Sequence, residues 1–318
     1  MLPESAVATS WGRRAAGVLA AVIVSGCAGE SPERQPGQVL LATTATGAPA
    51  CRVVDAGRPL PAEARESSGL ARSRRDPSIF WTHNDAGNEP VLFAVNAGGA
   101  LAGTVRVEGA TLEDWEDIAA GPCGSGHCLY VGDIGDNDAA RSSITVYRIE
   151  EPAPEAGAAG PVTPMRARYA GGARDAEALF VLGDRVHIVT KGRTGPIELY
   201  RYPSEGVASG AATLEKLGEL LPAPKSSTDR VTAAAASPDG RWVGIRTYRT
   251  LHLYRAAALV GGGAQRAAIT MDLRALKEAK GEGLEIADDG TVWLSSEAAK
   301  KSPPSLARLA CALPDSES

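Results

Sequence analysis

The apolar residues between Cys51 and Leu313 recur in short alternating runs, and Gly, Pro, Asp and Asn separate these runs. Alternation with a period of two predicts β-strands, and many evenly spaced short strands predict a closed all-β array. The runs fall into groups, whose first members align as "SSGLA", "WEDIA", "AEALF", "VTAAA" and "GEGLE". The alignment contains one polar column, formed by Ser68, Glu116, Glu177, Thr232 and Glu282.

The column residues are 48, 61, 55 and 50 positions apart, a spacing that indicates a structural repeat. The fifth repeat lacks a fourth strand, and the run "CRVVDAG" (51–57) is left over before the first repeat. We therefore predict a five-bladed β-propeller that its N-terminal strand closes, with six blades, a β-sandwich or two small domains as alternatives. The run "DLRALKEA" (272–279) has helical spacing, which predicts a short helix between the fourth and fifth blades.

The N-terminus has the pattern of an export signal. Arg13 and Arg14 precede an apolar run (15–24) that is too short for a permanent membrane helix, and "VSGC" follows it. This pattern predicts a lipoprotein signal peptide over 1–26, with a lipid on Cys27; an ordinary secretory signal is the alternative. Residues 27–50 have few bulky apolar side chains and predict a flexible tether, which leaves 51–318 as the propeller domain. The expected location is the periplasm or the outer face of the cell envelope, anchored to the membrane.

Four cysteines remain after Cys27, an even number that in an exported protein favours disulfides. Cys123 and Cys128 flank a short turn between two strand-like runs, so a hairpin bridge is expected, and Cys51 would then pair with Cys311. A zinc site is the competing interpretation, but the spacing of the cysteines gives it little support. The formal net charge of −5 argues against nucleic acid or an anionic lipid surface as a partner, and we expect a monomer.

In a propeller, the start of each first strand and the end of each second strand lie on the same face. The column residues would therefore share one channel mouth with Asp85, Asp133, Lys191 and Glu297, and with the loop "DIGDNDAARSS". Crowded carboxylates resist ionisation unless a cation compensates them, and Ca²⁺ prefers oxygen ligands. The predicted metal ligands are Asp133, Asp136, Asn137, Glu116 and Asp85. The alternative is a turn in which Asp136, Asn137 and Asp138 bond to Arg141 and to the backbone without a metal.

Several motifs carry a resemblance to a known group of proteins. The chain between Glu66 and Glu297 contains "SSGLA", "WTHNDAG", "DWEDIA", "GDIGDN" and "EGLEI". In these motifs it resembles uncharacterised bacterial β-propeller lipoproteins, and it is more distantly similar to SdiA-regulated propellers and to the esterase-like phytase group. The resemblance implies a propeller fold and an exported location. It implies no particular activity, because function resides in the site rather than in the fold.

The sequence has no nucleophile elbow, Walker A loop, dinucleotide fingerprint or zinc-protease motif, which argues against covalent serine and zinc mechanisms. Two functions remain. The first is a binding lipoprotein whose calcium-containing mouth recognises a polar small molecule, a glycan or a peptide. The second is a calcium-dependent hydrolase of phosphoesters or lactones, in which Glu116 or Glu282 activates water and Lys191 neutralises a phosphate. A glycosidase is a third interpretation. We favour the binding function, because the carboxylates are spread around the ring and no single acid–base pair stands out.

Overall fold

The computed structural model of the chain describes residues 50–203, 210–262 and 266–314. Contacts divide the chain into two units, Met1–Gly37 and Gln38–Ser318. The predicted signal peptide (1–26), the predicted lipid site Cys27 and the tether up to residue 49 lie outside the described residues. All that follows concerns the described part of the second unit.

This unit is all-β, and its strands form four sheets. One sheet has the order β2-β3-β4-β5 and contains β2 (Ala71–Arg72), β3 (Ile79–His83), β4 (Val91–Asn96) and β5 (Leu101–Arg106). A second has the order β14-β15-β16-β17 and contains β14 (Val231–Ala236), β15 (Trp242–Thr247), β16 (Thr250–Arg255) and β17 (Ile269–Asp272). A third has the order β1-β20-β19-β18 and contains β1 (Cys51–Pro59), β18 (Lys280–Ile286), β19 (Thr291–Glu297) and β20 (Ser305–Cys311).

The fourth sheet has eight strands and consists of two antiparallel groups of four. The first group is β6 (Trp115–Cys123), β7 (Gly126–Asp133), β8 (Ile144–Glu150) and β9 (Val162–Tyr169). The second group is β10 (Ala176–Leu182), β11 (Arg185–Thr190), β12 (Ile197–Arg201) and β13 (Ala212–Leu221). A short parallel pairing between the outer strands β9 and β13 joins the two groups.

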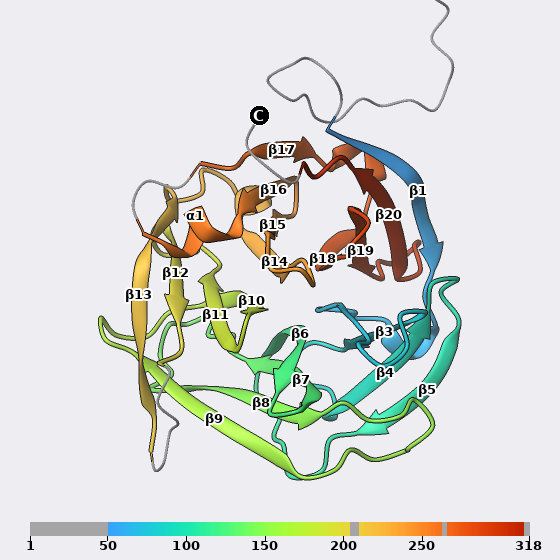
Figure 1. Cartoon of the computed structure of the whole chain (residues 1–318), viewed down its shortest axis with the longest axis horizontal. Coiled ribbons are helices and arrows are strands. Elements are labelled where there is room, and N and C mark those ends of the chain that lie inside the picture. The colour runs from blue at the N-terminus through green and yellow to red at the C-terminus, as the bar shows by residue number, and fades with distance from the viewer. Residues whose placement is uncertain (1–49, 204–209, 263–265, 315–318) are drawn as a thin grey trace, which may run out of the picture. The chain divides into compact units, whose positions relative to one another are not determined.

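The innermost strands form a ring (Figure 1). In that ring β2 contacts β6, β6 contacts β10, β10 contacts β14, β14 contacts β18, and β18 contacts β2. Between neighbouring groups of strands lies a separate apolar cluster; for example, Trp81, Trp115 and Leu129 pack between the first two groups. The remaining clusters fill the other interfaces around the ring. The predicted all-β propeller architecture is confirmed, because each sheet buries its faces against the next one around a common axis.

Helical structure is scarce among the described residues. It comprises α1 (Ala256–Val260) and the 3₁₀ turns η1 (Ala62–Ala64), η2 (Ser227–Asp229) and η3 (Arg274–Leu276). The helix expected over 272–279 is therefore wrong in extent: only η3 forms there, and Lys277 ends it with a φ of 55°. No described helix has the length and apolar character that a membrane crossing needs.

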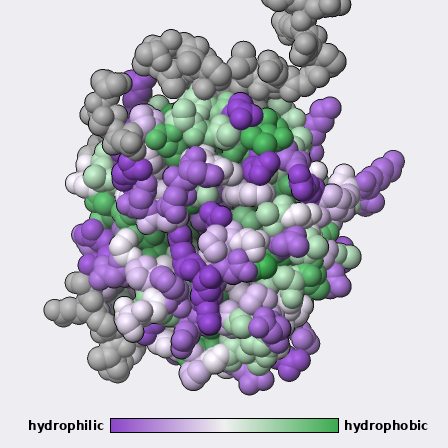
Figure 2. All heavy atoms as spheres, turned by 45° about the vertical axis from the view of Figure 1, so that its right-hand side comes forward, coloured by the Kyte–Doolittle hydropathy of each residue, from purple (hydrophilic) through white to green (hydrophobic). Residues whose placement is uncertain are grey.

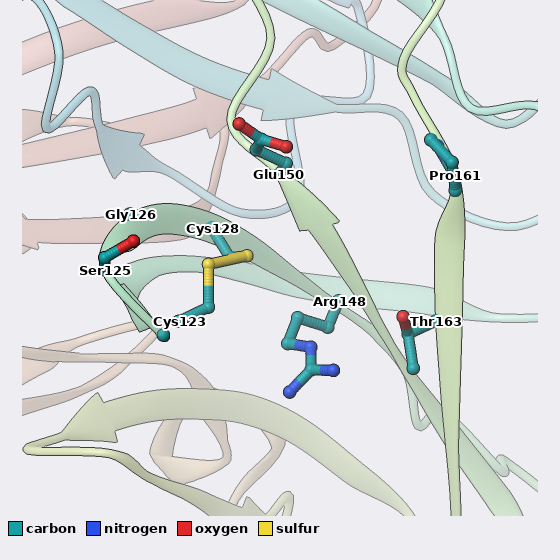
Figure 3. A pocket seen from close by; sticks show the side chains of 9 residues that line it. Cys123, Ser125, Gly126, Cys128, Arg148, Glu150, Pro161 and Thr163 are labelled. Atoms are coloured by element: carbon teal, nitrogen blue, oxygen red, sulfur yellow. A yellow bond between two sulfur atoms is a disulfide. The ribbon is translucent and has the colours of Figure 1, made fainter.

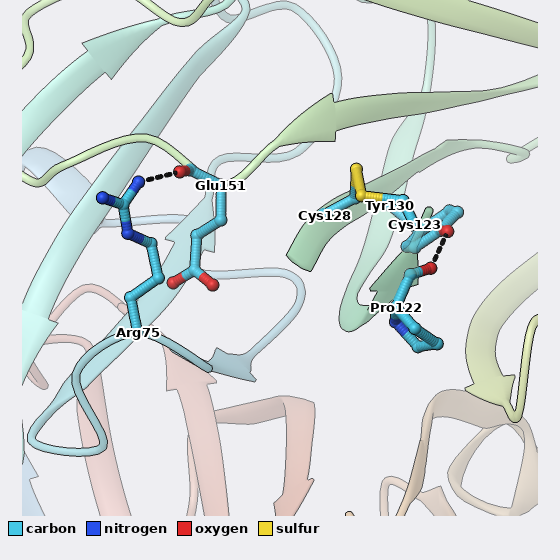
Figure 4. The surroundings of a disulfide bond; sticks show 6 residues. All are labelled: Arg75, Pro122, Cys123, Cys128, Tyr130 and Glu151. Atoms are coloured by element: carbon cyan, nitrogen blue, oxygen red, sulfur yellow. Dashed lines mark hydrogen bonds between the residues drawn. A yellow bond between two sulfur atoms is a disulfide. The ribbon is translucent and has the colours of Figure 1, made fainter. Parts of the chain in front are cut away.

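Both predicted disulfides are present. Cys51 and Cys311 are directly opposite each other in the antiparallel pair of β1 and β20, with a Cα–Cα distance of 4.0 Å. The second bond joins Cys123 to Cys128 across the β6–β7 hairpin, beside Tyr130, whose hydroxyl donates to the carbonyl of Pro122 at 2.7 Å (Figure 4). Disulfides form and persist in oxidising compartments, which agrees with the export that the N-terminus predicts.

The exposed surface is largely polar. Figure 2 shows hydrophilic side chains over most of one face, with hydrophobic ones in small separate areas. Among the described residues the exposed large hydrophobic side chains are Val54 and Leu101. No broad apolar patch therefore marks a docking surface in this part of the chain.

We expect the two disulfides to differ in their effect on stability. The Cys51–Cys311 bond spans 260 residues of sequence, whereas Cys123–Cys128 spans 5. In the chain-entropy account, replacing the first pair with alanine lowers the free energy of unfolding by about 5–6 kcal/mol, and replacing the second by about 2 kcal/mol. Urea denaturation of the two double variants measures the difference, and equal losses would contradict the idea that β1 and its bond tie together the ends of the propeller.

Candidate functional site

The polar column of the sequence corresponds to a repeated β-bulge. In four of the inner strand pairs the register shifts at one residue, so that this residue has no partner on the neighbouring strand. The skipped residues are Glu116, Glu177, Thr232 and Glu282. A bulge re-aims the side chain of the extra residue. Each of these side chains is buried, and three carboxylates from distant parts of the chain come close together at one end of the ring.

The first repeat has a different structure at its column residue. Ser68 lies before the short strand β2, and its backbone N–H donates to the carbonyl of His83 at 3.0 Å. Gly69 follows, and a Cβ at this position would lie 2.5 Å from the backbone nitrogen of Ile118 and 2.9 Å from Oδ1 of Asp117. The close approach of the inner strands therefore requires glycine here.

Asp117, the residue after Glu116, connects several inner strands. Its carboxylate accepts hydrogen bonds from the backbone N–H groups of Ile118 at 2.9 Å, Leu179 at 2.9 Å and Ala234 at 3.2 Å. These three donors belong to β6, β10 and β14, so one fully buried side chain links the inner strands of three neighbouring groups of four strands. Burial raises the pKa of Asp117 well above its usual range. Asp117 was not among the predicted site residues. In the aligned motifs it is only a short polar residue after Glu116.

A buried ion pair occupies one side of the mouth. The ammonium of Lys191 donates to Oε1 of Glu177, and both side chains are largely buried. Burial raises the pKa of Glu177 to about 8. Burial lowers the pKa of Lys191, but the carboxylates of Glu177 and Glu116 outweigh that effect and raise it overall. Lys191 therefore stays charged and compensates part of the acidic mouth.

A second lysine, Lys280, pairs with other carboxylates of the mouth. Nζ of Lys280 lies 2.9 Å from Glu282, 2.8 Å from Glu297 and 3.9 Å from Asp85. The hydroxyl of Tyr248 donates to Oε1 of Glu282 at 3.2 Å, whereas Oε2 of Glu282 has no hydrogen-bond partner among the described residues. Burial raises the pKa of Glu297 to about 7 and also raises that of Glu282. The predicted catalytic residues Glu116, Glu282 and Lys191 thus lie in one charged network.

Three carboxylates lie close together beside this network, and of the three only Asp85 forms an ion pair with a lysine among the described residues. Oxygen atoms of Asp85, Asp114 and Glu116 all lie within 4.8 Å of one another. Glu116 is 4% exposed, and its carboxylate has no hydrogen-bond or ion-pair partner among the described residues. Burial, followed by the charges of Glu177, Asp85 and Asp114, raises the pKa of Glu116 strongly. Burial and the charges of Asp85 and Asp175 raise the pKa of Asp114 to about 6.

Asp114 is absent from the metal ligands that the sequence predicted. Its signal was the "DWE" triplet, in which Asp114 and Glu116 are two positions apart and share one side of an extended segment. Gly135 packs against both residues, because a Cβ at Gly135 would overlap Oε1 of Glu116 and Oδ2 of Asp114. A side chain at the second glycine of "GDIGDN" would therefore displace the carboxylates of Glu116 and Asp114 from their present positions.

The other predicted metal ligands lie in the loop beside this cluster. Asp133 accepts hydrogen bonds from the backbone N–H groups of Glu113 at 3.2 Å and Asp114 at 3.1 Å, and from Nη1 of Arg141 at 2.8 Å. Asp136 accepts from the backbone N–H groups of Ala140 and Arg141, each at 2.8 Å.

Asn137, the remaining predicted ligand in this loop, accepts from Arg193. Of these three residues, Asp136 has the backbone contacts of the turn that the sequence allowed as an alternative, whereas Asp133 pairs with Arg141 and Asn137 with Arg193. It brings Glu116 and Asp85 together with Asp114.

One cavity in this unit lies away from the mouth. It has a volume of about 420 Å³ beside the Cys123–Cys128 disulfide, with Arg148, Glu150 and Thr163 on its walls (Figure 3). None of the predicted catalytic or metal residues lines it. The charged mouth therefore remains the better candidate for function, because buried polar groups with shifted pKa values gather at functional sites.

Comparison with known proteins extends only to the fold. No protein-family model matches the chain, and no curated protein sequence matches it. Among solved structures, the PQQ-bound aldose sugar dehydrogenase of Streptomyces coelicolor is similar over 82% of this chain and 97% of that chain, with 13% identity and a TM-score of 0.50. A gluconolactonase of Xanthomonas campestris covers 88% of this chain and 99% of its own, with 11% identity and a TM-score of 0.44. A β-propeller domain of Myceliophteria thermophila covers 76% and 83%, with 10% identity and a TM-score of 0.38.

A buried carboxyl elsewhere on the inner strands yields a prediction about pH. Burial raises the pKa of Glu285 to about 7 from its ordinary 4.5, and its Oε1 has no hydrogen-bond partner. The folded state thus holds this proton more tightly than the unfolded state, so stability falls as pH rises from about 4.5 to 7. The difference corresponds to about 3 kcal/mol. We expect Glu285→Gln to raise the melting temperature at pH 8 and to leave it almost unchanged at pH 4.5.

Thermal melts across this pH range test the prediction. The exposed Glu155→Gln serves as the control and should follow the wild type at every pH. A variant Glu285→Gln that lost stability with pH as steeply as the wild type would show that another group causes the loss.

Proposed function

We propose that the unit is a five-bladed propeller whose channel mouth binds a divalent cation, and through it a polar ligand. The ring of inner strands supports five blades, with the eight-stranded sheet counted as two. The pairing of β1 with β20 and the Cys51–Cys311 bond support closure of the fifth blade by the N-terminal strand.

The cation proposal rests on one observation: the buried carboxylate of Glu116 has no hydrogen-bond or ion-pair partner among the described residues. A carboxylate that is removed from water and receives no hydrogen bond is costly, and two further carboxylates nearby add repulsion. Lys191 and Lys280 pair with Glu177, Glu282 and Glu297, so they leave Glu116 and Asp114 without direct compensation. A divalent cation between Asp85, Asp114 and Glu116 would replace repulsion by coordination.

Calcium fits the donor set best. The three side chains offer only carboxylate oxygens, which suit a hard cation and do not favour zinc. Calcium takes six to eight oxygen ligands, so three side chains would leave several positions for water or for hydroxyl and carbonyl oxygens of a ligand. This incomplete protein shell supports a binding role for a polar small molecule, a glycan or a peptide.

The proposal includes the location of the protein and its attachment to the membrane. A signal peptide over 1–26 would direct export, a lipid on Cys27 would hold the chain at the membrane, and the tether to residue 50 would let the propeller project from the surface. Two disulfides and a modest acidic charge agree with a monomer outside the cytoplasm that binds no nucleic acid.

The first test is calorimetric titration of the protein with calcium chloride and with magnesium chloride. We expect calcium to bind more tightly, and Glu116→Gln to weaken calcium binding by at least about tenfold, because the substitution removes a charged ligand without changing its size. Calcium should also raise the melting temperature of the wild type, since it binds only the folded state.

Glu150→Gln, on an exposed strand end, is the matched control and should bind calcium like the wild type. Calcium affinity that is equal in Glu116→Gln and the wild type would contradict the proposed site. Asp133→Ala gives a further comparison. Asp133 forms an ion pair with Arg141, so we expect this variant to disturb the loop and to change calcium affinity less than Glu116→Gln does.

A hydrolase is the second candidate function, and the unpaired carboxylate oxygen of Glu282 favours it. This residue is 2% exposed, and its Oε2 has no partner, so this oxygen is free to accept a proton from water. Bound calcium would supply polarisation of a phosphoester or lactone oxygen. Calcium-dependent turnover that Glu282→Gln abolishes while calcium affinity is retained would establish the hydrolase. Calcium binding without turnover on phosphoesters and lactones would leave the binding function.

A further inference from the structure

A smaller cavity adjoins the mouth at the hairpin between β11 and β12. Its volume is about 240 Å³, and the loop 191–196 forms much of its wall. The lining residues are Arg174, Asp175, Thr190, Gly192, Arg193, Thr194, Gly195, Pro196 and Glu198. Asp175 connects the cavity to the mouth, because its carbonyl accepts the backbone N–H of Lys191 at 3.0 Å.

The loop that lines the cavity has four successive free donors. The backbone N–H groups of Gly192, Arg193, Thr194 and Gly195 have no backbone or side-chain acceptor among the described residues. The shape of the loop is fixed: Gly192 has a φ of +80°, and a Cβ there would lie 2.7 Å from Ile197 and 2.8 Å from Pro224. Successive backbone N–H groups in such a turn form a concave site for an anion.

Arg193 adds a positive charge that no acidic side chain neutralises. Its guanidinium donates to the amide oxygen of Asn137, and within the described part of the chain no carboxylate forms an ion pair with it. Arg174 on the opposite wall pairs with Glu198 at 2.9 Å, and Glu198 also binds Lys216 at 2.5 Å. The Glu198 carboxylate is thus compensated by two cations and does not oppose an anion in the cavity.

Asp175 gives the cavity a second kind of recognition. It is 4% exposed; its Oδ1 accepts the backbone N–H of Asp136 at 3.1 Å, and its Oδ2 has no partner. A buried carboxylate oxygen without a partner needs a donor, which a hydroxyl group supplies.

We propose that this cavity is a subsite for a small hydroxylated oxyanion. The phosphate or carboxylate group would be bound by Arg193 and the loop amides, and a hydroxyl would donate to Asp175. The lysines of the mouth are already paired with carboxylates, so an anionic group is better placed in this side cavity than beside Glu116. The inference deepens the proposed binding function and rests on it for the identity of the site, but the cavity can be tested without calcium.

The test uses two matched probes, glycerol 3-phosphate and D-glycerate, with glycerol as the uncharged comparison. Each is titrated by calorimetry into the disulfide-bonded protein at pH 7 without calcium, which also avoids precipitation of phosphate. We expect one or both anions to bind, glycerol not to bind, and Arg193→Gln to weaken anion binding by about tenfold. Preference for one anion identifies phosphate or carboxylate as the recognised group.

Arg148→Gln is the matched control, since Arg148 is an exposed arginine in the other group of four strands of this sheet, with no ion-pair partner among the described residues. It should bind both anions like the wild type. Failure of both anions to bind, equal binding of glycerol, or equal weakening by the two arginine variants would overturn the inference. Calcium titration of the same proteins separates the two proposals: Arg193→Gln should bind calcium normally, and a wild type that binds an anion but no calcium would refute the cation site alone.

Discussion

The structure of the mouth depends on the burial of several like charges around one axis. Bulges in four inner strand pairs turn Glu116, Glu177, Thr232 and Glu282 out of the ladder, and the apolar blades behind them exclude water. A low-dielectric setting makes each uncompensated carboxylate expensive. Lys191 lowers this cost by pairing with Glu177, and Lys280 does so by pairing with Glu282 and Glu297. The charge that has no such partner is at Glu116 and Asp114. This residual charge, more than the fold, is what indicates a ligand.

Much of the fold could be predicted because it depends on features that repeat along the chain. Alternating runs gave the strands, and the excess first strand together with Cys51 and Cys311 indicated which ends must meet. The column residue was visible because four of the five repeats have a side chain outside the ladder at the same place. The helix over 272–279 was overestimated for the opposite reason: a segment that occurs once has no repeat to test it, and Lys277 stops it after one turn.

The site was only partly predictable, because the sequence shows which carboxylates share a rim but not which of them already have partners. Asp133 and Asp136 are the most conspicuous acids of the loop, and their oxygens accept bonds from Arg141 and from backbone N–H groups. Asp114 was missed because it precedes the strand and the column. Asp117 was missed because its role depends on N–H groups of Leu179 and Ala234, which are remote in sequence.

The two kinds of polar group at this end of the ring have different physical roles. Asp117 and the Glu177–Lys191 pair have their partners within the protein: Asp117 links three inner strands, and the Glu177–Lys191 pair joins the two strands of one hairpin. Oε2 of Glu282 and Oδ2 of Asp175 are buried and lack such partners, and the Glu116 carboxylate forms no hydrogen bond or ion pair among the described residues. Buried polar atoms are normally satisfied, but other buried atoms far from the mouth, such as Nε2 of His187 and Nε1 of Trp242, also lack a partner. What sets the three carboxylates apart is their common location at one end of the ring, which supports the proposed ligand.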